Sequence, residues 1–287
     1  MGAAGVVGVE VDSVAAVEAS VALAEAPQAA VEREGDGKTM STTGLKHMAA
    51  ERDLTDLVRK LKDGAGSNLI SAILYGSAAT EEFRPGHSDL NVLCIMRRLS
   101  REDLSSLHAA SSWWAKKGHP APLFLTLDEL QQSADIFAIE LLDMKAAHRL
   151  LEGEDVLPSL YVPTNLHRLQ VERELRSNAL RLRQLYIRYP SDVQKTLALM
   201  TSSISTFAAL FRHALIALGE EPPPTKRGAT DRLASVLGFD PSPFHAIFDI
   251  REGHKRGRDL DVQATFAAYL HRVSHVAEEM DRRLAAS

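Results

Sequence analysis

The chain has 287 residues, of which 45% are hydrophobic and 25% charged, and this length and composition are ordinary for a globular protein of one large or two smaller domains. Residues 1–39 hold seven acidic residues against Arg33 and Lys38, so this stretch carries the whole formal net charge of −5. The rest of the chain is formally neutral, which argues against a general nucleic-acid binder.

The single cysteine, Cys94, excludes an internal disulfide and a cysteine-based zinc site. We therefore expect a reducing, cytoplasmic setting. No apolar run approaches the roughly 20 residues of a membrane span, so no membrane partner is expected. The sequence has no basic residue before Arg33, a pattern unlike that of a signal or transit peptide.

Residues 1–43 are rich in Ala, Val, Glu and Gly and show no persistent helical stripe. They are expected to be a disordered tail, or a start assigned too early with Met40 as the true one. A weak alanine-rich helix is the third alternative.

Residues 44–160 alternate between helical and extended patterns. Helical spacing predicts a helix from about Lys46 to Leu61, and Ser100 with Asp103 forms a capping-box pattern that starts a second helix ending near Gly118. Short apolar runs predict four strands: Ile73–Tyr75, Val92–Ile95, Pro122–Leu127 and Phe137–Leu142. This alternation predicts an α/β domain built on a mixed sheet with helices.

The predicted secondary structure changes near residue 160, after Pro158, because the rest of the chain shows only helical patterns. Apolar residues at three-and-four spacing predict helices at 166–189, 192–218, 228–237, 242–254 and from Val262 to the end. Amphipathic helices joined by short loops predict an all-α helical bundle over residues 161–287.

The most informative stretch runs from Ile73 to Ile95. The first apolar run stops at the pair Gly76-Ser77, and twelve residues past Ser77 a second strand is expected to open with Asp89. Because side chains alternate along a strand, Asp89 and Asn91 should point to one side. Two oxygen groups able to bind a metal would then face the Gly-Ser turn, while Leu90 and Val92 face the opposite layer.

This pattern resembles the DNA-polymerase-β-like nucleotidyltransferase superfamily, whose signature is a strand ending in Gly-Ser followed by Asp-x-Asp or Asp-x-Glu on the next strand. The chain matches it up to Asp89 and departs at Asn91, which stands in place of the second acid. The helical half is similar in arrangement to that of aminoglycoside nucleotidyltransferases. The resemblance implies transfer of a nucleotide from a nucleoside triphosphate, ATP or similar, to a hydroxyl of a small molecule or protein, with Mg²⁺ or Mn²⁺.

The resemblance also implies roles for particular residues. Gly76, Ser77 and Ser88 would contact the nucleotide, and Asp89 with Asn91 would hold the metal, Asp89 being the catalytic acid of the pair. Mg²⁺ takes oxygen ligands, usually one or two carboxylates together with phosphates and water. An amide carbonyl can coordinate a cation but adds no charge, so the second metal position should be the weaker.

The superfamily takes its third acid, a general base, from a later strand. The run Leu123–Leu127 has no acid inside it, so Glu140 in the expected strand Phe137–Leu142 is the preferred candidate and Asp143 the next. Their strand parity differs, so at most one would face the site. The competing interpretation makes Glu140 an exposed edge-strand residue.

Two functions therefore compete. One is a nucleotidyltransferase; the alternative is a non-catalytic nucleotide-binding or interaction protein of the same fold, favoured by Asn91 and by the acid-free strand. The expected partners are a nucleoside triphosphate and an unidentified acceptor, and a homodimer is left open.

Overall fold

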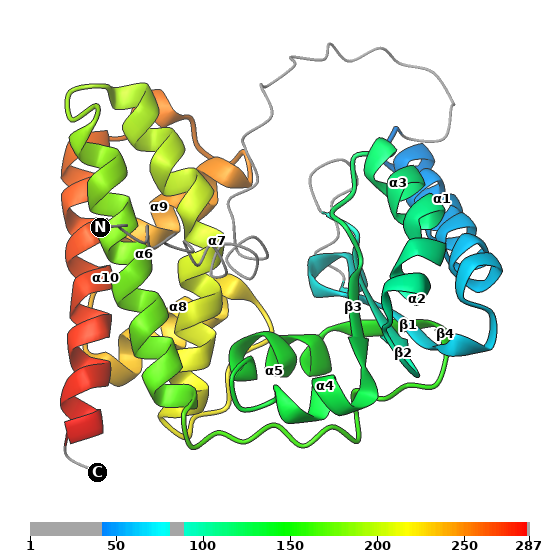
Figure 1. Ribbon diagram of the computed structural model, residues 1–287. Coiled ribbons are helices and arrows are strands. Elements are labelled where there is room, and N and C mark those ends of the chain that lie inside the picture. The colour runs from blue at the N-terminus through cyan, green and yellow to red at the C-terminus, as the bar shows by residue number, and fades with distance from the viewer. Residues whose placement is uncertain (1–41, 81–88, 286–287) are drawn as a thin grey trace, which may run out of the picture. The chain divides into compact units, whose positions relative to one another are not determined.

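A computed structural model describes residues 42–80 and 89–285. The expectation for the N-terminal tail lies outside the described residues. The chain divides into two compact units, and the boundary falls between Gln170 and Val171, about one helical turn into α6, whereas the sequence predicted a change near residue 160. Figure 1 labels the helices and strands of both units.

The first unit is a four-stranded mixed sheet with helices. Its strands lie in the order β3-β2-β1-β4, with β1 antiparallel to β2 and β4, and β2 parallel to β3. Its elements are α1 (Thr42–Ala65), β1 (Leu69–Tyr75), β2 (Asn91–Met96), α2 (Arg101–Ser106), α3 (His108–Lys116), β3 (Leu123–Thr126), α4 (Leu127–Gln132), α5 (Ala138–Ala146) and β4 (His148–Gly153), with short 3₁₀ turns at Gly66–Asn68 and Gly76–Ala79.

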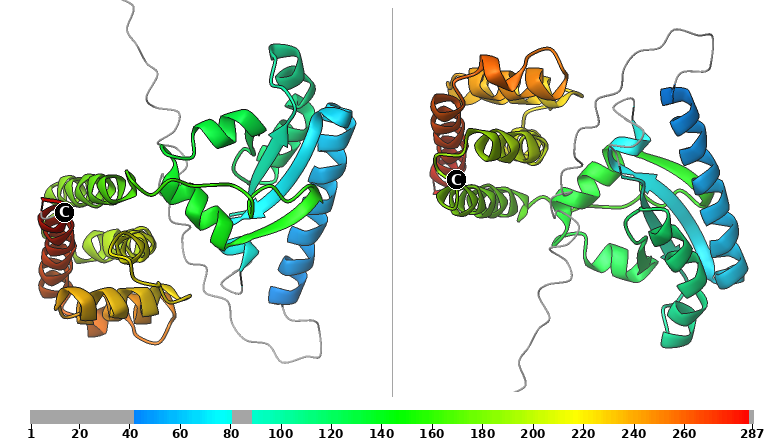
Figure 2. Two further views of the ribbon diagram at one scale, coloured as in Figure 1. Left: turned by 90° about the horizontal axis from the view of Figure 1, so that it is seen from below. Right: turned by 90° about the horizontal axis from the view of Figure 1, so that it is seen from above.

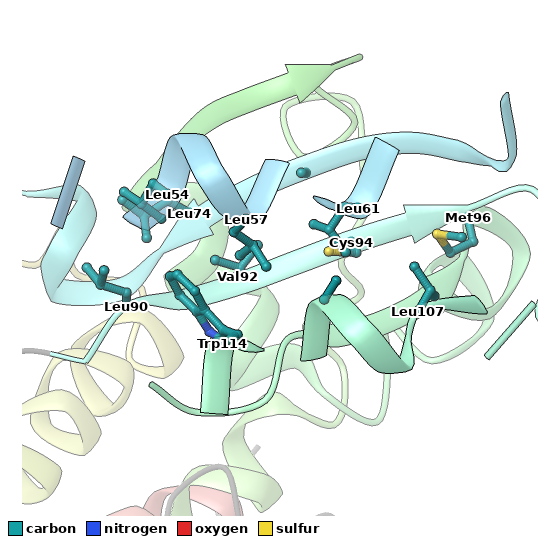
Figure 3. Packing of buried hydrophobic residues seen from close by; sticks show 12 residues of the cluster. Leu54, Leu57, Leu61, Leu74, Leu90, Val92, Cys94, Met96, Leu107 and Trp114 are labelled. Carbon is teal, nitrogen blue, oxygen red and sulfur yellow. The ribbon is translucent and has the colours of Figure 1, made fainter. Parts of the chain in front are cut away.

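Helices cover both faces of this sheet (Figure 2). On one face, apolar residues of α1 and α3 pack against alternate residues of β1 and β2 (Figure 3). The helices contribute Leu57 and Trp114, and β2 contributes Val92 and Cys94. On the other face, Ile73, Leu93 and Ile95 pack against α4, α5 and the segment that follows β4. The two central strands are thus buried on both faces, which is why they read in the sequence as continuous apolar runs.

The structure corrects two of the predicted elements and adds a strand that was not predicted. Phe137–Leu142, predicted as a strand, lies mostly in helix α5, and the fourth strand is β4. A short apolar run fits a buried helix as well as a strand, and here the following residues Asp143–Ala146 extend it as a helix. The capping box at Ser100 and Asp103 is confirmed, but its helix is broken at Leu107 into α2 and α3.

The second unit is the predicted all-α bundle, so the fold class is confirmed: a mixed α/β sheet followed by helices. Its helices are α6 (His167–Ile187), α7 (Val193–Ala217), α8 (Lys226–Leu237), α9 (Ser242–Arg251) and α10 (Val262–Ala285), with a 3₁₀ turn at Gly257–Asp259. Edge-to-face aromatic contacts fill its centre, where Phe211 meets Phe239 and Phe244, and Phe207 meets Tyr269.

Helix α7 is the central helix of the bundle and contacts α8, α9 and α10. It is also the one described helix long and apolar enough to cross a membrane by length and composition. Half of its most apolar window is buried inside the unit, as expected for the core helix of a bundle.

Candidate functional site

The Gly-Ser pair forms the turn that ends β1. Gly76 has a φ of +78°, a backbone conformation that glycine adopts without strain. Its N–H donates to the carbonyl of Ala147 at 3.1 Å, and Ser77 continues into a single 3₁₀ turn that Thr80 closes through two hydrogen bonds to the Ser77 carbonyl. The Gly76–Ala79 turn is therefore anchored to the start of β4.

Asn91 lies over this turn. It is the first residue of β2 and pairs directly with Tyr75. A Cβ built on Gly76 would lie 3.6 Å from the Asn91 side-chain nitrogen, so the amide and the turn are in van der Waals proximity. The expected alternation is also seen, because Leu90 and Val92 are buried in the cluster on the α1 face.

Asp89 precedes β2 by two residues, rather than opening the strand as predicted. Its side chain is exposed. Within residues 42–80 and 89–285, no hydrogen bond or ion pair joins its carboxylate to another residue. Ser88, the third residue expected to contact a nucleotide, lies outside the described residues.

No carboxylate comes from the neighbouring strand β3 on the Asn91 side. Leu93 and Ile95 share the face of Asn91, and their partners on β3 are Leu123 and Leu125. This agrees with the acid-free strand noted in the sequence.

Glu140 belongs to the first turn of α5, so the strand assigned to it was wrong. In a helix, residues three apart are neighbours, so Glu140 and Asp143 share one side of α5, and the strand-parity argument that only one of them could face the site does not apply. Helix α5 packs through Leu141 on the sheet face that carries Asn91. Both acids are half-buried, in the layer on the Asn91 side.

His148 is a residue of this region that sequence reasoning missed. It begins β4 opposite Tyr75, so Asn91, Tyr75 and His148 form a row across three strands on one face. Burial raises the pKa of the Tyr75 phenol, which therefore stays neutral near pH 7. The strand β4 was not predicted, and the only sequence signal for it was the pair Leu150-Leu151, two residues after His148.

The two residues expected to hold a metal would suit one hard cation better than two. They are Asp89, whose carboxylate is exposed, and Asn91, whose amide is neutral. Mg²⁺ bound through one carboxylate, with substrate phosphates as its other ligands, is a common arrangement. These two side chains would give a second ion little charge.

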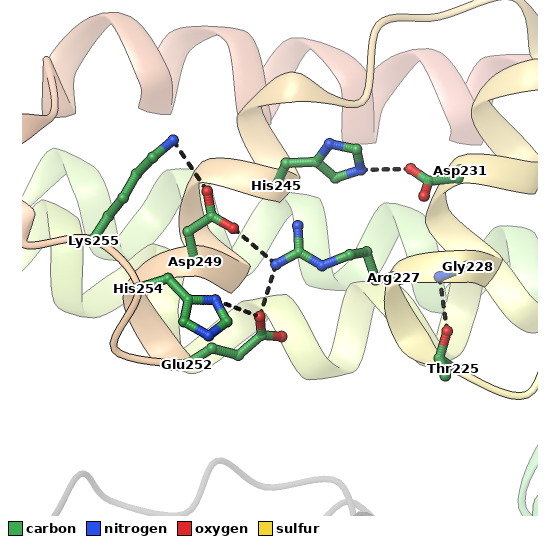
Figure 4. A network of polar contacts seen from close by, with 9 residues as sticks. All are labelled: Thr225, Arg227, Gly228, Asp231, His245, Asp249, Glu252, His254 and Lys255. Atoms are coloured by element: carbon green, nitrogen blue, oxygen red, sulfur yellow. Dashed lines mark hydrogen bonds and ion pairs between the residues drawn. The ribbon is translucent and has the colours of Figure 1, made fainter.

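A different group of ligand-type side chains lies in the bundle. Asp249, Glu252 and His254 bring one ligand atom each within 4.8 Å of one another. Arg227 donates to both carboxylates, at 3.0 and 2.9 Å, and Lys255 pairs with Asp249 at 3.0 Å (Figure 4). A metal would have to displace two cations, so this group is an ion-pair network between α8 and the end of α9.

No protein-family model matches the sequence, and no curated protein matches it. Among solved structures, the chain is similar to spectinomycin adenyltransferase AAD(9) from Enterococcus faecialis, crystallised with ATP and spectinomycin. The TM-score is 0.49 and the identity 15%, over 78% of this chain and 98% of that one. A likeness of this size does not bear on activity.

Proposed function

We propose that this protein binds a nucleoside triphosphate at the Gly76–Ser77 turn and transfers its nucleotide to a hydroxyl of a small molecule or protein. The observation that carries the proposal is the position of Asn91, whose amide lies over the Gly76 turn with the exposed Asp89 two residues before it. The turn, the carboxylate and the amide follow one another in the order of the nucleotidyltransferase signature, with Asn91 in place of its second acid.

In this reaction, the acceptor oxygen forms a bond to the α-phosphorus, and the bond from that phosphorus to the bridging oxygen breaks to release pyrophosphate. Gly76 and Ser77 hold the phosphates, Asp89 and Asn91 supply oxygen ligands for Mg²⁺ or Mn²⁺, and Ser88 contacts the nucleotide. The bound metal would neutralise charge on the phosphate oxygens. Glu140 is the proposed base for the acceptor proton, with Asp143 as the second candidate.

A second function, nucleotide binding without transfer, is favoured by two observations. Asn91 removes one negative charge from the metal site, and β3 offers only Leu123 and Leu125 on the Asn91 face. Both reduce the site's ability to hold two metal ions without removing the phosphate-binding turn.

Labelled nucleoside triphosphates separate the two functions. Wild type, Asp89→Ala and the control Asp63→Ala are incubated with Mg²⁺ or Mn²⁺ and a panel of hydroxyl acceptors; Asp63 is an exposed acid on α1. Transfer that is lost in Asp89→Ala and kept in Asp63→Ala supports the enzyme. Metal-dependent binding without transfer selects the second function, and absence of both refutes the proposal.

Two further variants refine the assignment. If charge limits the metal site, Asn91→Asp should raise metal-dependent binding or turnover. Glu140→Gln should lower turnover about 10²–10⁴-fold, the contribution of general base catalysis, while leaving triphosphate binding unchanged. Should Asp143→Asn give that loss instead, the base is Asp143.

A further inference from the structure

Helix α6 presents a line of arginine and aliphatic side chains to solvent. Five exposed residues of this helix follow one another at alternating three- and four-residue spacing: Arg173, Arg176, Leu180, Arg183 and Ile187. We call them the α6 stripe. Leu180 is 55% exposed and Ile187 is 73% exposed. Spacing of this kind aligns side chains along a helix, as in the seam of a coiled coil, so the α6 stripe is suited to contact with a second helix.

The positive charge of the α6 stripe is only partly neutralised within the bundle. Arg176 pairs with Glu172 at 2.6 Å and with Asp281 of α10 at 3.1 Å. Among the described residues, no ion pair joins Arg173 or Arg183 to an acid. The helix as a whole has five arginines and two glutamates. A partner for the α6 stripe should therefore be acidic and should also carry aliphatic side chains.

A segment of matching chemistry lies near the start of the chain. Residues 10–25 hold four acids and no basic residue. Aliphatic residues repeat there at the same three-and-four spacing for about three turns: Val14, Val17, Val21 and Ala24. Glu18 and Glu25 follow two of these residues directly, so one side of a helix would carry both the aliphatic and the acidic side chains. A run this short is not a stable helix by itself in water, and a partner helix would have to support it.

We propose that residues 10–25 dock as a helix on the α6 stripe of the same chain. The valines contact Leu180 and Ile187, and the glutamates pair with the arginines that have no acidic partner in the bundle. Residues 26–41 connect this segment to α1 and span up to about 55 Å when extended, which exceeds the roughly 32 Å length of the 21-residue helix α6. A tethered segment has an effective concentration on the order of millimolar, so a weak contact is sufficient for docking.

A second copy of the chain matches the α6 stripe less well. Two α6 stripes facing each other would bring arginine against arginine, and like charges on neighbouring helices repel. The segment of residues 10–25 has the opposite charge and the same spacing. The docking surface is therefore assigned to contact within one chain, and it does not depend on nucleotide binding.

Disulfide exchange in the full chain measures how close the segment lies to the α6 stripe. Ser20 lies within the segment, and Ser177 is an exposed residue next to the α6 stripe, so Ser20→Cys with Ser177→Cys places two thiols at the edge of the proposed contact. The control combines Ser20→Cys with Ser235→Cys, an exposed position on α8, which packs on α7 and α9. Cys94 does not interfere, because it is fully buried. The equilibrium constant with oxidised glutathione gives the effective concentration of one thiol at the other.

We expect the effective concentration at position 177 to exceed that at position 235 about fivefold, because each of two surface ion pairs favours docking by about two- to threefold. The excess should shrink in 1 M NaCl, where charges are screened within about 3 Å. Equal effective concentrations at the two positions overturn the proposal. A disulfide that joins two chains, seen as a dimer on a non-reducing gel, overturns docking within one chain.

Charge reversal tests whether the glutamates and arginines hold the segment. Arg173→Glu with Arg183→Glu should abolish the excess at position 177, although this variant also loses the hydrogen bond from Arg183 to the Ser274 hydroxyl. Glu18→Lys with Glu25→Lys should abolish it too and changes no residue of the bundle. All four changes together make the charges opposite again and should restore the excess. An excess that survives both reversals overturns the proposal.

Discussion

Replacing Gly76 by alanine separates two reasons for a glycine at the turn that is proposed to bind phosphate. The φ of +78° costs an alanine about 1–2 kcal/mol, since a Cβ is strained in the left-handed region. Space is not the difficulty, because the nearest atom to the added Cβ would be the Asn91 nitrogen at 3.6 Å, an ordinary contact. Gly76→Ala should therefore fold, with about 1–2 kcal/mol less stability. On the proposed function it should bind triphosphate poorly, because its Cβ would lie where the phosphates approach the backbone.

Gly118 provides the matched control. It lies in the same unit with a φ of +86° and nothing within 4 Å of an added Cβ, so Gly118→Ala should lose a similar stability and keep nucleotide binding. Gly153 has much less space for an added Cβ, which would lie 1.9 Å from the Ile70 carbonyl oxygen. Gly153→Ala should cost about 3 kcal/mol or more, from strain and overpacking together.

Urea unfolding followed by tryptophan fluorescence measures these changes, because the two tryptophans of the chain, Trp113 and Trp114, both lie in α3 of the sheet unit. Nucleotide affinity is measured on the same proteins. If Gly76→Ala and Gly118→Ala weaken binding equally, the Gly76 turn is not the phosphate site. If Gly76→Ala is as destabilising as Gly153→Ala, the described turn geometry is wrong.

Three further predictions concern the sheet unit. Cys94 is fully buried, which raises the pKa of its thiol to about 12, so Ellman's reagent at pH 8 should label it only in urea; rapid labelling of native protein would contradict its place in β2. Leu57→Ala should cost about 2–5 kcal/mol, because Leu57 is fully buried between α1 and the sheet, and a loss below about 1 kcal/mol would be inconsistent with that packing. The hydrogen bond from the Ser100 backbone N–H is the main reason why the pKa of Asp103 is lowered in the folded protein. Because the folded pKa lies below the unfolded one, Asp103 stabilises the fold at a pH above its unfolded pKa. This stabilisation is lost as the pH falls through the folded pKa. Urea unfolding of Asp103→Asn should show a deficit against wild type at pH 7 that vanishes in strong acid, and an equal deficit at both pH values would refute the capping role.

The chain's local patterns were sufficient for most of its helices. The three-and-four spacing in α7 and α10 follows from burial of one side of a helix, and the capping box at Ser100 depends on residues three apart. Such signals are contained within a few turns of chain. The helix break at Leu107 was not predicted, since nothing in the spacing of the apolar residues marks it.

The strands were harder to predict, because their partners are distant in sequence. The run at Phe137–Leu142 had the length and composition of a strand, yet it continues into α5 and packs on the sheet through Ala138 and Leu141. The true fourth strand begins at His148 and has two exposed residues in its first half, Arg149 and Leu150. Edge strands carry weak patterns, because only part of their surface is buried.

By itself, the sequence determined the fold class, the Gly76-Ser77 turn after a buried strand and the place of Asn91 on the next strand. The signals for the turn and for these strands lie in residues close together in the chain. Only the tertiary structure decided that Glu140 and Asp143 belong to a helix and that His148 joins the row of Asn91 and Tyr75. Cross-strand register and helix packing are set by contacts between distant segments, and no local pattern records which segments those will be.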